Sequence, residues 1–144
     1  MKKEKTALKK GAGAYLGLAV AALACVSLIL YLIYATSADG LFMPWVLALL
    51  ILVLAVEGIL FVWDNDYLPI LAAGLSAAAF GCFLMDPPET IGSVVDYFQN
   101  IVMFGNPEKF GIIMVLTVLL LIMTMVAVAA CFLNRVKAAP GAAK

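Results

Sequence analysis

One carboxylate, Glu57, lies inside a run of apolar side chains, "LAVEGILFV" (54–62). Insertion scales place the cost of an acidic group near the centre of a membrane helix at roughly 2.5–3.5 kcal/mol, so such a group is expected to face other helices. Two chemistries fit it: a carboxylate that binds a proton or a cation, or a neutral carboxyl that hydrogen-bonds a neighbouring helix. The second is favoured because no Lys, Arg or His shares the apolar runs.

Partners for this carboxyl are sought among the hydroxyl groups of the apolar runs and the nearby acids. The hydroxyl candidates are Ser27, Ser76, Thr117 and Thr124. Asp64 follows Glu57 by seven residues and therefore falls on nearly the same helix face. With Asp66 it is expected to form an acidic entrance that faces the cytoplasm.

Residues for catalysis or metal binding are missing from the sequence. The chain has no histidine, which is the commonest metal ligand and the commonest general base near neutral pH. Cys25, Cys82 and Cys131 fall in separate apolar runs without a CxxC pair, so we expect buried, unreactive thiols. The sequence predicts a protein that is not an enzyme, with no cofactor, no metal and no nucleic-acid partner.

The elements that hold Glu57 are expected to be transmembrane helices. Hydrophobic residues make up 66% of the 144 residues and charged residues 12%, against about 45–50% and 25% in soluble domains. A helix needs ~20 apolar residues to cross the bilayer. We predict an all-α integral membrane protein, a four-transmembrane-helix bundle with an amphipathic helix on the outer surface between spans three and four. The spans are expected at about 14–34, 44–63, 68–85 and 107–133, within one membrane domain, 14–133.

The charges predict how these spans are oriented. Eight of the nine Lys and Arg residues lie in two basic tails, 1–13 and 134–144. The positive-inside rule then places both termini in the cytoplasm of a multi-pass plasma-membrane protein. The first apolar run is too long for a signal peptide and is expected to be a retained span. Aromatic residues are expected at the inner interface (Trp63 and Tyr67) and at the outer one (Tyr31, Tyr34, Phe42 and Trp45).

Small residues recur every four positions in two spans and predict close helix packing. They are Gly13, Gly17 and Ala21 in span one, and Ala73, Ala77 and Gly81, with Gly74 and Ala78 beside them, in span three. We therefore expect spans one and three to make the tightest contacts of the bundle. In span four, Thr117, Thr124 and Cys131 recur every seven residues. We expect a seam between helices or hydroxyls bonded back to their own helix, rather than a polar conduit.

The segment between spans three and four has the pattern of an amphipathic helix at about 90–103. Its apolar face consists of Ile91, Val94, Val95, Phe98 and Val102, and its polar face of Ser93, Asp96, Gln99 and Asn100. We expect it to lie flat on the outer membrane surface or to roof the bundle, with partner binding as the alternative. In the following "NPEK", Asn106 suits an N-cap and Pro107 the first helical position of span four.

Two motifs resemble a known group of sequences. "GAYLG" at Gly13–Gly17 and "VDYF…MFGNP" at Val95–Pro107 are similar to segments of uncharacterised four-span membrane proteins of Gram-positive bacteria. The resemblance covers most of the chain and implies the four-span plan, with no established activity.

The sequence thus favours a non-enzymatic accessory or scaffold subunit of a membrane assembly. Its expected partners are the lipid bilayer and either a membrane protein or further copies of the chain. The alternative is a small oligomeric transporter or channel-like protein that uses Glu57, and a weaker alternative is a holin-like membrane protein.

Overall fold

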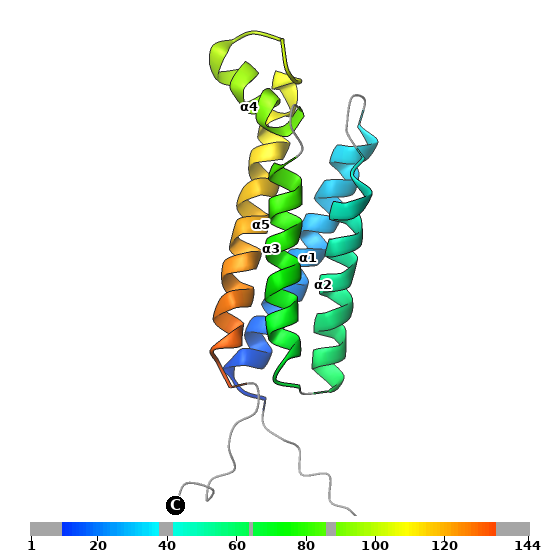
Figure 1. Cartoon of the computed structure of the whole chain (residues 1–144), viewed down its shortest axis with the longest axis vertical. Coiled ribbons are helices and arrows are strands. Elements are labelled where there is room, and N and C mark those ends of the chain that lie inside the picture. Colours follow the sequence, from blue (N-terminus) through cyan, green and yellow to red (C-terminus); the bar gives the residue numbers. More distant parts are fainter. Residues whose placement is uncertain (1–9, 38–41, 64, 86–88, 135–144) are drawn as a thin grey trace, which may run out of the picture.

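The structure, a computed structural model, describes residues 10–37, 42–63, 65–85 and 89–134. Every element in these ranges is a helix, and the four long ones run side by side (Figure 1). The elements are α1 (Ala12–Thr36), α2 (Pro44–Val62), α3 (Leu68–Leu84), α4 (Glu89–Gln99), the 3₁₀ helix η1 (Pro107–Lys109) and α5 (Phe110–Cys131). Each long helix begins and ends close to the boundaries expected from the apolar runs.

Three of these helices are long and apolar enough to cross a membrane. They are α1 with 25 residues, α2 with 19, and the continuous η1–α5 segment Pro107–Cys131 with 25. Helix α3 is also apolar but has only 17 residues, which is about 26 Å at 1.5 Å per residue and less than the ~30 Å of hydrocarbon. The chain is therefore an all-helical, membrane-embedded protein with three candidate spans and one shorter apolar helix.

The two ends of the helix array differ. At one end the N–H of Gly13 donates to the carbonyl of Asn134 (3.2 Å), so the start of α1 and the end of α5 meet. We call this the terminal end. At the other end, the α4 end, α4 contacts both α3 and α5 (Figure 1).

The helices pack in a ring in which α1 contacts α2 and α5, and α3 contacts the same two helices. Helices α1 and α3 therefore lie across from each other, and the prediction that they make the tightest contacts was wrong. Short connections place helices that follow each other in the chain side by side. A stripe of small residues allows a close approach but does not specify which helix approaches. Large apolar side chains such as Leu50, Phe83 and Leu116 fill the space between the four helices.

Two tyrosines expected at the lipid interface are instead buried between helices. The Tyr31 hydroxyl donates to the Met43 carbonyl (2.8 Å) and accepts from the Met43 N–H (2.6 Å), which fastens the start of α2 to α1. The Tyr34 ring meets Phe83 edge-on, with ring centroids 6.2 Å apart. A tyrosine that can satisfy its hydroxyl inside the protein has no need of the interface. The other four predicted interfacial aromatics, Phe42, Trp45, Trp63 and Tyr67, are exposed.

Three of the four hydroxyls predicted to accompany Glu57 are satisfied locally, whereas the buried Ser27 hydroxyl has no hydrogen-bond partner among the described residues. Ser76, Thr117 and Thr124 each donate to the carbonyl four residues earlier at 2.8 Å, and the Cys131 thiol does the same at 3.3 Å. This confirms that the seven-residue pattern of α5 marks hydroxyls bonded to their own helix. The expectation of buried thiols was wrong for Cys25 and Cys82, which lie on outward helix faces, while Cys131 is half-buried. Nothing prevents such a small apolar side chain from facing lipid.

Candidate functional site

Glu57 lies on the inward side of α2 and is only 5% exposed. It lines a cavity of about 300 Å³ between α1 and α2. The other lining residues are Ala14, Gly17, Leu18, Ala21, Leu54, Gly58 and Phe61. Gly17 and Ala21, which were expected to pack on α3, instead provide the space opposite the carboxyl.

The other groups predicted to accompany Glu57 do not meet it in this cavity. None of the four candidate hydroxyls is among the lining residues. Asp66 is exposed in the connection between α2 and α3 and does not line the cavity, and Asp64 lies outside the described residues. The acidic entrance is therefore not assembled from the residues that the structure describes.

A cation that sequence reasoning did not consider lies near the cavity. The Lys10 ammonium is 3.1 Å from the centroid of the Phe61 ring, and Phe61 lines the cavity towards the terminal end. In the sequence, the only signal for this contact is that Lys10 directly precedes the first apolar run. A cation over an aromatic face at this site links the start of α1 to the end of α2.

Helix α3 turns three of its five predicted packing residues away from the other helices. Ala73 is buried, but Gly74, Ala77 and Ala78 are exposed and Gly81 is half-buried. A Cβ added at Gly74 or Gly81 would meet nothing within 4 Å. We name the outward row of Gly74, Ala78 and Cys82, four residues apart, with Ala77 and Gly81 beside it, the α3 stripe.

At the α4 end the α3 stripe leads to an apolar hollow of about 390 Å³. The hollow lies between the end of α3 and the start of α2. Cys82 and Met85 line it from the α3 side, and Phe42, Met43, Pro44, Trp45 and Val46 from the α2 side. Trp45 is 75% exposed, so a large indole ring stands beside this hollow without a cover.

We name the segment Glu89–Lys109 the α4 cap. A helix that roofs the bundle is expected to cover it with its apolar face, but the buried side of α4 carries polar side chains. Its polar side chains Thr90, Ser93 and Asp96 are buried. Most of the predicted apolar face points outward: Ile91, Phe98 and Val102 are exposed and Val95 is half-buried, while the half-buried Val94 packs against the core. A roof laid on the bundle through this apolar face is therefore wrong.

The reason for the reversal is the loop that follows α4. The Asp96 Oδ2 atom accepts hydrogen bonds from three successive backbone N–H groups, those of Met103 (2.9 Å), Phe104 (2.8 Å) and Gly105 (2.8 Å). The Ser93 hydroxyl accepts from the next N–H, that of Asn106 (3.0 Å). Two side chains of α4 thus satisfy four consecutive donors, an arrangement that favours a negative charge at its centre.

Two glycines permit this close approach. A Cβ on Gly92 would lie 2.7 Å from the Phe104 carbonyl oxygen, and one on Gly105 would lie 2.5 Å from the Ser93 backbone nitrogen. Asn100, with φ of 53°, ends α4 in a left-handed conformation that Asn tolerates well. Asn106 then caps η1 by accepting the Glu108 N–H (3.0 Å), which confirms the predicted N-cap.

The environment of Asp96 keeps it ionised. Burial raises the pKa of its carboxyl, but the hydrogen bonds from Gly105, Met103 and Phe104 lower it by more, so the pKa falls below its ordinary value of 3.8. Sequence reasoning placed Asp96 and Ser93 on the polar face of the amphipathic helix and missed this role. The available signal was the pair "GSVVD" and "FGN", in which glycines adjoin side-chain acceptors and backbone donors.

Within the described ranges, no group of three His, Cys, Asp or Glu side chains could hold a metal ion. No protein-family model matches the chain, and neither a curated protein nor a solved structure is significantly similar to it. Function must therefore be argued from the cavity at Glu57, the α3 stripe and the α4 cap.

Proposed function

We propose that this protein is a non-enzymatic accessory subunit of a membrane assembly, and that the α3 stripe docks a transmembrane helix of a partner protein. In this proposal all four long helices cross the plasma membrane and both termini are cytoplasmic. The observation that carries the proposal is the outward position of Gly74, Ala77 and Ala78 on α3.

The physical argument starts from lipid as a solvent. Because lipid tails are as apolar as leucine, membrane helices associate through close packing, and small residues allow two backbones to approach. Among the described residues, the stripe members Gly74, Ala77 and Ala78 are exposed, since α3 turns its opposite face towards α2 and α5. A stripe that faces outward is suited to a helix from another protein.

The length of α3 supports the same conclusion independently. A hydrophobic helix shorter than the bilayer is accommodated by thinning the bilayer or by association with other protein. At 17 residues α3 is the shortest of the four long helices. The apolar hollow at Cys82, next to the exposed Trp45, gives a partner helix a second contact beyond the stripe.

The α4 cap would lie on the outer side in this arrangement, at the α4 end of the bundle (Figure 1). Its exposed apolar residues include Ile91, Phe98 and Val102. An apolar helix face that points away from the protein fits the boundary between headgroups and acyl chains. The cap then anchors the outer ends of α3 and α5 at a fixed depth.

The test is a leucine placed in the stripe. Gly74→Leu puts a bulky side chain where the protein has open space, so the fold should tolerate it while helix docking should fail. We expect the native complex, extracted in mild detergent and separated by blue native electrophoresis, to shift to the mass of the free chain. Ala22→Leu, at an exposed position on α1, is the matched control and should leave the complex unchanged. Equal complexes in both variants would contradict the proposal.

A second candidate, a small transporter, is favoured by one observation: the Glu57 carboxyl lines a cavity rather than being packed on all sides. Reconstitution of the purified chain into liposomes separates the two functions. An accessory subunit should give no proton or cation flux above empty liposomes. Flux that is present in the parent and lost in Glu57→Gln would establish transport instead.

A further inference from the structure

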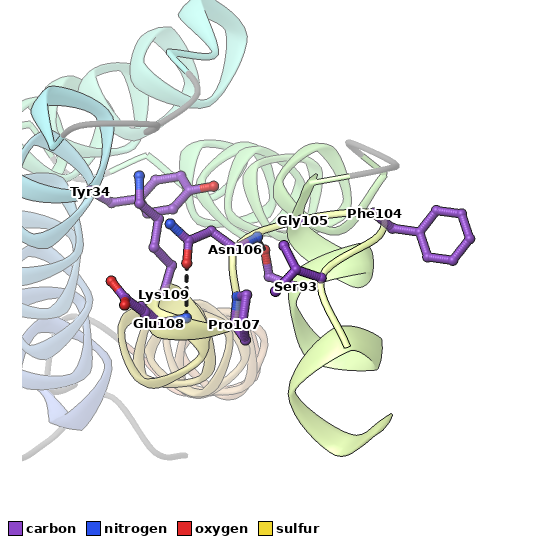
Figure 2. A pocket seen from close by; sticks show the side chains of 9 residues that line it. Tyr34, Ser93, Phe104, Gly105, Asn106, Pro107, Glu108 and Lys109 are labelled. Atoms are coloured by element: carbon purple, nitrogen blue, oxygen red, sulfur yellow. Dashed lines mark hydrogen bonds between the residues drawn. The ribbon is translucent and has the colours of Figure 1, made fainter. Parts of the chain in front are cut away.

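A pocket of about 530 Å³ opens at the α4 end, between the end of α1 and the loop of the α4 cap. Tyr34 of α1 lines it on one side, and Ser93 with the loop residues Val102, Phe104 and Gly105 on the other. Its base is the start of the last helix, Asn106–Lys109 (Figure 2). This pocket is separate from the Glu57 cavity and from the α3 stripe.

Lys109 gives this pocket its chemical character. It is the only basic residue between Lys10 and Arg135. Its ammonium is enclosed, and no described residue accepts a hydrogen bond from it. The Tyr34 ring, with its centroid 5.5 Å away, attracts the cation but accepts none of its three N–H bonds. Buried charged groups ordinarily have a hydrogen-bond acceptor or an opposite charge beside them, and the described residues provide neither a carboxylate nor another acceptor for this ammonium.

The groups around Lys109 suit an anion. The side-chain oxygen of Asn106 accepts the Glu108 N–H, so the amide nitrogen is turned towards Tyr34 and Lys109 (Figure 2). The carboxylate of Glu108, by contrast, points away from the Lys109 ammonium (Figure 2). Asn106 and Lys109 lie at the beginning of the 25-residue helical segment Pro107–Cys131, where the partial positive charge of the helix end favours negative groups.

The position of the pocket along the long helices indicates which anion is available to it. Tyr34 lies about one helical turn beyond Tyr31, and the Tyr31 hydroxyl binds Met43 at the start of α2. Phe42 and Trp45, on either side of Met43, are exposed, as residues of an interfacial aromatic belt are. In the membrane arrangement proposed above, the pocket therefore lies at the level of the interface, where phosphate groups are the abundant anions.

We propose that this pocket binds a phosphate-bearing anion, with the Lys109 ammonium and the Asn106 amide as donors. The phosphate is carried by a lipid headgroup or by a soluble molecule, because both present the same oxygen acceptors. The proposal is independent of the docking function, since it uses neither the α3 stripe nor a partner protein.

The experiment measures the thermal unfolding midpoint of the full chain in a neutral maltoside detergent. Four additions are compared in two pairs: phosphatidylglycerol against the phosphate-free lipid digalactosyldiacylglycerol, and inorganic phosphate against acetate at equal ionic strength. A ligand that binds only the folded protein raises the midpoint by mass action, here by about 3 °C or more at saturation. Binding should appear with a phosphate compound and not with the galactolipid or acetate.

Three variants assign the effect to the pocket. Lys109→Gln should lose the phosphate-dependent rise, Lys109→Arg should keep it because guanidinium also binds phosphate, and Lys10→Gln, a charge removal at the terminal end, should keep it. A rise with phosphatidylglycerol alone identifies a lipid headgroup, and a rise with inorganic phosphate identifies a soluble source. The proposal is overturned if no phosphate compound raises the midpoint, or if Lys109→Gln responds as the parent does.

Discussion

Two carboxylates are enclosed in the part of the chain that the structure describes, and their surroundings differ. Asp96 in the α4 cap accepts three backbone N–H bonds through one oxygen, and its position fixes the loop 103–105. Glu57 in α2 lines a cavity of about 300 Å³ whose other walls are mostly apolar and small. One acid is a structural anchor for backbone, and the other borders an open space.

The comparison shows that burial of an acid does not by itself indicate function. In a membrane chain, Glu57 attracts attention because a carboxyl in hydrocarbon is costly. Asp96 looks like an ordinary surface acid in the sequence, yet it holds a whole segment together because backbone donors of a loop must be satisfied. The contacts, and not the neighbouring sequence, separate the two roles.

The largest effect is expected from Gly105→Ala in the cap. The new Cβ would lie within 3 Å of the Ser93 backbone, which has no freedom to move without shifting α4. Such overpacking costs about 1–3 kcal/mol, so the cap should open and expose the Lys109–Phe110 bond to trypsin. Gly111→Ala is the matched control, because a Cβ there meets nothing within 4 Å. Equal cleavage rates in the two variants would show that the close approach is unimportant.

The next effect is expected from Asp96→Asn, which keeps the shape of the side chain but removes its charge. Hydrogen bonds to charged groups are stronger than those to neutral ones, so tryptic cleavage after Lys109 should rise on the order of tenfold. Asp66→Asn removes an exposed charge near the terminal end and should leave the rate unchanged. If Asp96→Asn behaves like Asp66→Asn, the carboxylate does not anchor the loop.

A smaller effect on the cap is expected when the pH is lowered. Because the pKa of Asp96 is lowered in the folded cap, its ionised form favours the closed cap. This contribution is complete above the ordinary value of 3.8 and is lost as the pH falls through the lower folded value. Amide exchange at residues 103–105, corrected for its intrinsic pH dependence, should therefore speed up below about pH 4. In Asp96→Asn this acid-dependent increase should vanish.

The smallest effect is expected from Glu57→Gln. The amide has nearly the same size and still donates and accepts hydrogen bonds, and the adjoining cavity leaves room for adjustment. The thermal midpoint should move by roughly 3 °C or less. A loss of stability as large as that of Gly105→Ala would instead make Glu57 a structural anchor and remove the contrast with Asp96.

Much of the helical plan follows from the sequence. Continuous apolar runs bounded by charges or proline indicate where α1, α2 and α5 begin and end, because hydrocarbon requires a minimum length. The pairing of helices does not follow in this way. Gly17 and Ala21 of α1 face the Glu57 cavity, whereas Gly74, Ala77 and Ala78 of α3 face outward, and four-residue spacing is compatible with either.

The α4 cap shows the other limit. Periodicity correctly indicates an amphipathic helix but not which face is covered, because that depends on the next segment of chain. Ser93 and Asp96 turn inward since four N–H groups of residues 103–106 come to them. Such a contact joins residues up to thirteen positions apart, so no pattern within one helix reveals it.

Cysteine cross-linking in membranes tests the central claim most directly. With Cys25 and Cys131 replaced by serine, the native Cys82 on the α3 stripe is the only thiol of the chain. A maleimide–benzophenone reagent attached to the Cys82 thiol, which on illumination inserts into C–H bonds of a neighbouring protein, should then join the chain to one partner of defined mass, and Gly74→Leu should abolish this product. A chain that keeps only Cys25, on the exposed face of α1, should give none. Equal yields from Cys82 and Cys25, or a product that persists in Gly74→Leu, would contradict docking at α3.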